Sequence, residues 1–117
     1  MKSGTDLIND AKTRIKEVSP REALAMCARG DTTFLDVRDQ HEVNLGKIPG
    51  ALHISRGTLE TKIEAAVPRD AQVVIYCASG NRSALAAETL QQMGYEKVSS
   101  LTGGFRGWAE AGGDIDG

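Results

Sequence analysis

Several kinds of residue are scarce in this chain of 117 residues, and each scarcity excludes a class of protein. Aromatic residues make up 4% and the net charge at pH 7 is −2, so the chain has neither the stacking surface nor the basic surface of a nucleic-acid-binding protein. Two cysteines are too few for a disulfide scaffold or for a zinc site of the usual kind. No apolar run approaches the roughly 20 residues that span a bilayer. We therefore expect no nucleic-acid partner and no membrane partner.

The beginning of the chain carries charges throughout and has no apolar signal segment. Together with the small number of cysteines, this predicts a cytoplasmic location, where thiols stay reduced. Hydrophobic residues at 40% and charged residues at 26% are typical of one globular domain. Leu7, Ile8, Ala11 and Ile15 have helical spacing, so we interpret residues 1–16 as an N-terminal helical extension of a domain at 17–117. We favour a surface helix over an interaction arm.

From residue 17 onward, strand and helix signals alternate. Apolar and β-branched runs predict strands at 17–18, 32–37, 51–55, 73–76 and 97–101. Helices are predicted at 20–28, 59–67 and 83–93, and from 103–104 through 108, with Ser19 as an N-cap and with Gly30 and Gly94 as C-terminal stops. Strands that alternate with helices form parallel sheets, so the predicted fold is α/β, a five-stranded, mainly parallel sheet with helices on both faces.

Cys77 stands at the carboxyl end of the fourth predicted strand, where sites form in open parallel sheets. The residues from Ala78 to Asn81 are small, and such a loop can curl until successive N–H groups point inward as an anion-binding nest. The helix that begins near Ser83 adds its positive N-terminal end, and Arg82 adds a full charge. These features favour the thiolate, so we predict a lowered pKa and a nucleophilic Cys77.

Other candidate residues have simpler interpretations. Cys27 lies in a predicted helix without a glycine loop, and we interpret it as a structural cysteine. His41 and His53 are isolated; a Cys–His dyad is an alternative route to an activated thiol, but the predicted nest already activates Cys77. Phe105 and Trp108 are expected in the core or in the wall of a cleft.

Three stretches of the chain resemble the signatures of one family, the rhodanese-type sulfurtransferases in their single-domain form. The likeness runs from about Val18 to Trp108. The stretches are the loop Cys77-Ala78-Ser79-Gly80-Asn81-Arg82-Ser83; the segment Leu35-Asp36-Val37-Arg38 with Glu42 and Gly46-Lys47-Ile48-Pro49-Gly50-Ala51; and Leu101-Thr102-Gly103-Gly104-Phe105 with Trp108.

The resemblance implies a rhodanese-like three-layer sandwich and a persulfide mechanism. Cys77 would take sulfane sulfur from thiosulfate or a persulfide and pass it to cyanide, a small thiol or a protein thiol, as a thiosulfate:cyanide-type sulfurtransferase does. The loop would hold the anionic outer sulfur, and neither a metal nor an organic cofactor is needed. Ala78 and Ser79 are neutral, so thiosulfate and less charged persulfide donors are equally open, as is a protein that supplies the sulfur.

The charged residues near the loop are expected to support it. We predict that Arg82 braces the loop, with Asp36 as its partner, and that Arg38 and Glu42 form an ion pair between a strand end and a helix start. Two functions are alternatives to sulfur transfer with turnover. The first is a sulfur-carrier or persulfide-sensing module without turnover, and the more distant one is a cysteine phosphatase. Rhodanese-like phosphatases have one more residue between cysteine and arginine than the four found here.

Overall fold

The sheet has five strands, and every neighbouring pair runs parallel. The structure is a computed structural model that describes residues 1–117. The strands lie in the order β1-β5-β4-β2-β3, which places β4 at the centre. Their bounds are β1 Lys16–Val18, β2 Thr33–Asp36, β3 Leu52–His53, β4 Val73–Tyr76 and β5 Val98–Leu101. The predicted five-stranded sheet is confirmed, and it is parallel throughout rather than mainly.

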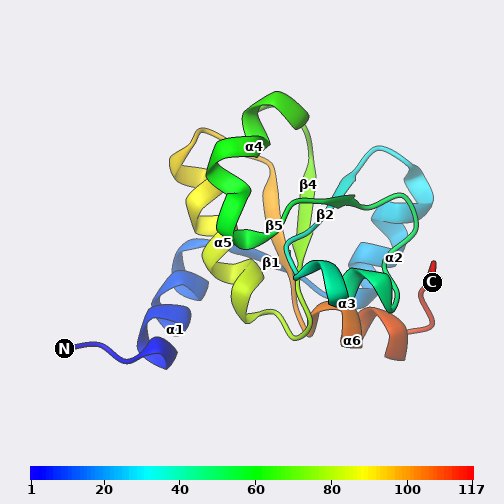
Figure 1. Cartoon of the computed structure of the whole chain (residues 1–117), viewed down its shortest axis with the longest axis horizontal. Helices are drawn as coiled ribbons and strands as arrows, with labels where there is room; N and C mark the ends of the chain where they lie inside the picture. The colour runs from blue at the N-terminus through cyan, green and yellow to red at the C-terminus, as the bar shows by residue number, and fades with distance from the viewer.

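Helices cover both faces of the sheet, as the rhodanese-like three-layer sandwich requires. Figure 1 shows α1, α4 and α5 on one side of the strands and α2, α3 and α6 on the other. The helices are α1 Gly4–Arg14, α2 Pro20–Arg29, α3 Gln40–Asn44, α4 Leu59–Ala66, α5 Asn81–Gln92 and α6 Gly104–Glu110, with a 3-10 turn η1 at Arg56–Thr58 before α4. None of the helices combines the length and the apolar character of a membrane-spanning segment.

Each face of the sheet has its own hydrophobic core, because successive strand residues point to opposite faces. In β4, Val73 and Ile75 pack with the buried residues of α4 and α5, while Val74 and Tyr76 pack with those of α2 and α6. All four residues of β4 are buried, which explains its continuous apolar run. The central strand is therefore held on both faces up to its last residue, directly before Cys77.

Local signals placed most helix ends. Ser19 caps α2 in a capping box with Glu22, and Gly30 and Gly94 adopt positive φ at the ends of α2 and α5. Two differences stand out: α3 is not among the helices for which bounds were predicted, and α5 begins at Asn81 rather than at Ser83. Its N-cap is Gly80, so the helix grows directly out of the loop that follows Cys77.

The N-terminal segment forms α1 and packs on α5. Ala11 is fully buried between the two helices, and Arg14 forms an ion pair with Glu88 of α5. Lys12 Nζ donates to the Asn81 side chain, 3.2 Å away, at the first turn of α5. The helix thus lies on the surface of the sandwich, and the division into 1–16 and 17–117 stays a prediction.

Candidate functional site

Two N–H donors and one hydroxyl group surround one sulfur atom at the end of β4, and in its thiol form Cys77 Sγ donates to that hydroxyl. The Gly80 N–H lies 3.1 Å from Cys77 Sγ, the Ser83 N–H lies 3.4 Å away and the Ser83 hydroxyl lies 3.5 Å away. Gly80 makes this turn possible: its φ is +102°, and an added Cβ would lie 3.3 Å from the Leu101 carbonyl oxygen. One N–H thus reaches Sγ from within the small-residue loop and a second one from the first turn of α5.

The surroundings of Cys77 lower its pKa. Burial is the largest single influence and by itself raises the pKa of the thiol, because it disfavours the charged form. Hydrogen bonds from the Ser83 hydroxyl and from the N–H groups of Ser83, Gly80 and Ser79 together outweigh burial. The first turn of α5 contains no acidic residue, so the positive end of this helix faces the thiolate without competition. The geometry thus agrees with an activated thiol.

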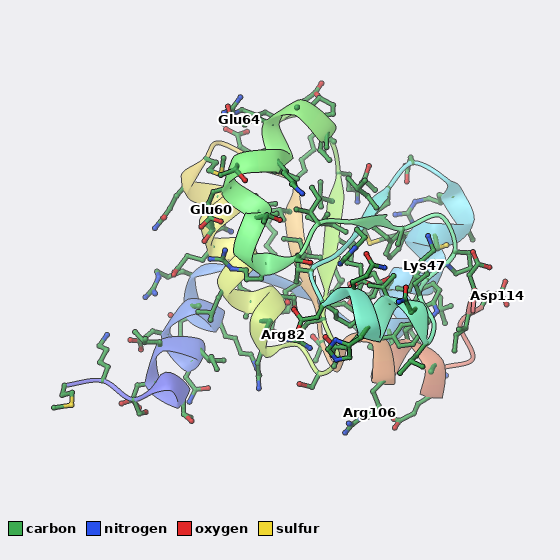
Figure 2. The ribbon with its side chains drawn as sticks, in the orientation of Figure 1. Lys47, Glu60, Glu64, Arg82, Arg106 and Asp114 are labelled. Carbon is green, nitrogen blue, oxygen red and sulfur yellow. The ribbon has the colours of Figure 1, made fainter.

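Arg82 braces the loop, but its partner is Glu42 rather than Asp36. Two guanidinium nitrogens of Arg82 each lie 2.9 Å from one carboxylate oxygen of Glu42. Figure 2 shows Arg82 at the start of α5, on the side that faces α3, which carries Glu42. The main effect on Glu42 is the hydrogen bond from Arg82, which helps to hold the pKa of that carboxyl at about 2. Our prediction of an Arg82–Asp36 pair is wrong.

The predicted Arg38–Glu42 pair is also wrong, because Arg38 pairs with Asp36 and Glu42 pairs with Arg82. Arg38 Nε lies 3.0 Å from one Asp36 carboxylate oxygen and Nη2 lies 2.7 Å from the other. Both side chains are almost fully buried. Residues two apart at the end of an extended strand point to the same face, so Asp36 reaches Arg38 before any group on α3 can.

The Asp36–Arg38 pair joins the strand end to its surroundings. Arg38 Nη2 also donates to the carbonyl of Gly46, 2.7 Å away, and the guanidinium lies 4.5 Å from the ring centre of Phe105. Phe105 stacks on Tyr76, and Trp108 is buried, as expected of core residues. Asp36 and Arg38 therefore support the site from outside the sulfur cradle.

The start of α6 holds the Cys77 loop from behind. The N–H of Phe105 donates to the Cys77 carbonyl at 2.7 Å, and the N–H of Arg106 donates to the Ala78 carbonyl at 3.2 Å. Gly104 has φ +57°, and an added Cβ would lie 2.4 Å from the Cys77 carbonyl oxygen. Sequence reasoning recognised Gly103-Gly104 as a helix start and missed this contact, although the pair of glycines was a signal for a close backbone approach.

The remaining candidates lie outside the cradle. His53 Nε2 is 2.7 Å from the Arg38 carbonyl, and no hydrogen bond joins either histidine to Cys77. Asp39, His41 and Glu42 place possible metal-ligating atoms within 4.8 Å of one another. The Glu42 carboxylate, however, accepts from Arg82 and from the Asp39 N–H, so the group is explained as a helix cap with an ion pair.

No cavity opens onto the sulfur. The structure has three surface cavities, and none is lined by Cys77 or by the loop that follows it. The most apolar one, of about 240 Å³, lies between α2 and the C-terminal segment and includes the partly buried Cys27. Cys77 itself is 1% exposed. A reactant must therefore bring its reacting atom to the mouth of the loop.

Comparisons with known proteins agree with this geometry. The sequence model of one protein family, the rhodanese-like domain, matches residues 19–111. The chain is 31% identical over 96 residues to the thiosulfate sulfurtransferase GlpE of Tolumonas auensis, covering 82% of this chain and 90% of that protein. It is 39% identical over 82 residues to a sulfurtransferase of Allochromatium vinosum, covering 70% of this chain and 76% of the relative.

A solved structure matches almost the whole chain, including α1. It is a protein of unknown function from Rhodopseudomonas palustris, described as a possible tyrosine phosphatase. The TM-score is 0.91 at 36% identity, and the match covers 99% of this chain and 96% of that one. From the family match and the two curated relatives it follows that this chain belongs to the rhodanese-like domain family, in which those relatives are sulfurtransferases.

Proposed function

We propose that this protein transfers sulfane sulfur from a donor to a thiophilic acceptor through a persulfide on Cys77. The observation that carries the proposal is the cradle of Gly80 N–H, Ser83 N–H and Ser83 hydroxyl around one Sγ. Donors that point at a single atom stabilise an anionic sulfur, both as thiolate and one bond further out as persulfide. The names of the curated relatives support sulfur transfer as the chemistry.

The first half of the reaction loads the cysteine. With thiosulfate as donor, the Cys77 thiolate attacks the outer sulfur and forms a new S–S bond. The bond between that sulfur and the sulfonate breaks, and sulfite leaves with the bonding electron pair. The total charge is unchanged, because one thiolate and one dianion become one persulfide anion and one sulfite dianion. The cradle and the positive end of α5 stabilise the negative charge throughout.

The second half regenerates the enzyme. The carbon of cyanide, or the sulfur of a thiolate acceptor, attacks the outer sulfur of the persulfide. The Cys77–sulfur bond breaks and its electron pair returns to Cys77, which becomes the thiolate again. With cyanide the product is thiocyanate. An S–S bond of about 2.05 Å moves the outer sulfur away from the buried Sγ and toward the acceptor.

A phosphatase is the competing activity, because it is named for the Rhodopseudomonas palustris protein. Phosphate ester hydrolysis needs donors for several oxygens of a tetrahedral group. Here only four residues separate Cys77 from Arg82. The two guanidinium nitrogens that would bind such oxygens are both occupied by Glu42. These observations favour a single sulfur over phosphate.

A sulfur carrier that works with a partner protein is the second candidate. It is favoured by the absence of a cavity lined by the loop among the three surface cavities, since a partner protein supplies its own binding surface around the sulfur. In that case Cys77 loads stoichiometrically from a protein persulfide, while turnover of small molecules stays near background. A reducing compartment such as the predicted cytoplasm keeps both cysteines as thiols between turnovers.

The test is thiocyanate formation from thiosulfate and cyanide by the wild type, Cys77→Ser and Cys27→Ser. We expect loss of turnover only in Cys77→Ser, and one extra sulfur on Cys77 by mass spectrometry after treatment with thiosulfate or glutathione persulfide. Equal turnover in Cys77→Ser and wild type contradicts the proposal. Hydrolysis of para-nitrophenyl phosphate by Cys77, without persulfide formation, supports the phosphatase. Loading without turnover supports the carrier.

A further inference from the structure

Behind the sulfur cradle lies a second buried hydroxyl. Ser100 of β5 and Ser83 of α5 are both fully buried, and their Oγ atoms are 2.8 Å apart. Ser83 Oγ is in turn 3.5 Å from Cys77 Sγ. Ser100 lies opposite Ile75 in the register of β4 and β5, close to the end of β4 and thus to Cys77, which follows it. A chain of polar atoms therefore runs from the sheet, through Ser83, to the sulfur.

The hydroxyl protons of Ser83 and Ser100 have one favourable arrangement. Ser83 Oγ is the only hydrogen-bond partner of the Ser100 hydroxyl, so the Ser100 proton can be donated only to Ser83. If Ser83 donated to Ser100 instead, the Ser100 proton would be buried without an acceptor, which is unfavourable. In its thiol form Cys77 Sγ donates to Ser83 Oγ. With Ser100 as donor, the one proton of Ser83 is free to point at Cys77 Sγ once the sulfur is ionised.

We propose that Ser100 is a positioning residue that directs the Ser83 hydroxyl toward Cys77 and thereby favours the thiolate form of the sulfur. It does not contact the sulfur itself and acts only through Ser83. An ionised sulfur accepts hydrogen bonds and donates none, so a hydroxyl whose direction is already set matches the thiolate and the persulfide anion. The inference rests on the proposed function only in taking Cys77 as the nucleophile.

The test is the rate of Cys77 alkylation by iodoacetamide as a function of pH, in a Cys27→Ser background so that one thiol reacts. The rate rises with pH as Cys77 ionises, and the midpoint of this rise reports the pKa of Cys77. Loss of one directed hydrogen bond should raise the midpoint in Ser100→Ala by about half to one pH unit. Below both midpoints, the rate should fall about three- to tenfold. Ser99→Ala is the matched control. It removes a hydroxyl from the preceding residue of β5, which has no hydrogen bond to Ser83, so the midpoint in this variant should not move.

A double-mutant comparison separates positioning from a general packing effect. Once Ser83→Ala has removed the intermediate hydroxyl, adding Ser100→Ala should leave the midpoint where Ser83→Ala put it. A Ser100→Thr variant, which keeps a hydroxyl, should restore the wild-type midpoint. If Ser100→Ala does not fold, Ser100→Val and Ser100→Thr make the same comparison, since they share a shape and differ in the hydroxyl.

Two results overturn the inference. One is an unchanged midpoint in folded Ser100→Ala; the other is a shift of equal size with and without Ser83. Either result leaves the proposed function standing, because alkylation requires no sulfur transfer. Conversely, a shifted midpoint in a protein that forms no persulfide supports the role of Ser100 and contradicts the proposed function.

Discussion

Replacing Gly104 by alanine tests whether the start of α6 holds the Cys77 loop in place. The new Cβ would lie 2.4 Å from the Cys77 carbonyl oxygen and 2.6 Å from the Ala78 carbonyl carbon. Both are backbone atoms, so no side-chain rotation relieves the overlap. Either α6 or the loop must move, and the hydrogen bonds that donate to the Cys77 and Ala78 carbonyls must lengthen.

The expected loss of stability has two parts. Alanine at φ +57° costs about 1–2 kcal/mol in the left-handed region. Forcing an extra methyl group into a packed site costs about 1–3 kcal/mol more. The sum is about 2–5 kcal/mol. Because the loop carries the donors to Cys77 Sγ, its displacement should also raise the pKa of Cys77 toward the ordinary value.

The assay is urea unfolding together with the pH dependence of Cys77 alkylation. Two glycines are matched controls: Gly112 has φ +88° with nothing within 4 Å of an added Cβ, and Gly57 has neither a positive φ nor a neighbour. We expect Gly112→Ala to cost only the conformational part, about 1–2 kcal/mol, and Gly57→Ala to be close to neutral. The reasoning is refuted if Gly104→Ala costs no more than Gly112→Ala and leaves the alkylation midpoint unchanged.

Three further predictions concern groups around the loop. Glu42→Gln should lower stability by about 1 kcal/mol at pH 7, since the pair is partly exposed. The pKa of the Glu42 carboxyl is lowered from 4.5 to about 2 in the folded protein. The stability difference between wild type and Glu42→Gln should therefore be complete above pH 4.5 and should disappear as the pH falls through 2, as measured by urea unfolding at each pH. Asp36→Asn should cost about 3–5 kcal/mol by the same assay, because a buried guanidinium loses its counter-charge; a cost below 1 kcal/mol contradicts this. Tyr76→Phe leaves the buried N–H of Ile48 without its hydroxyl acceptor and should lower the free energy of unfolding by about 1–3 kcal/mol; an unchanged thermal midpoint argues against it.

Much of the site followed from neighbouring residues in the chain. The apolar run before Cys77, the small residues after it and the helix that follows lie within about twenty residues, and their local chemistry predicts strand, nest and helix start. The structure places Gly80 and Ser83 around the sulfur as this reasoning requires. Only the start of α5 was placed two residues too late, because Asn81 and Arg82 were interpreted as loop.

The ion pairs could not be predicted in the same way. Four charged groups, those of Asp36, Arg38, Glu42 and Arg82, allow two ways of pairing. The spacing of two between Asp36 and Arg38 is compatible with their pairing, but it does not show where Glu42 and Arg82 lie. The choice depends on where α3 lies relative to α5 and on how β2 ends. These are consequences of packing between segments that are far apart in the chain, where spacing carries little information about distance.

By itself, then, the sequence determined the alternation of strands and helices, the caps and the place of Cys77 at the end of a buried strand, because hydrophobic period, capping and loop chemistry act over a few residues. The tertiary structure alone decided what lies behind the Cys77 loop. It placed β5 beside β4, which brings Ser100 behind Ser83, and it placed Gly104 against the Cys77 carbonyl. Such contacts join residues 17 or more positions apart, and they exist only once the parallel sheet has set which strands are neighbours.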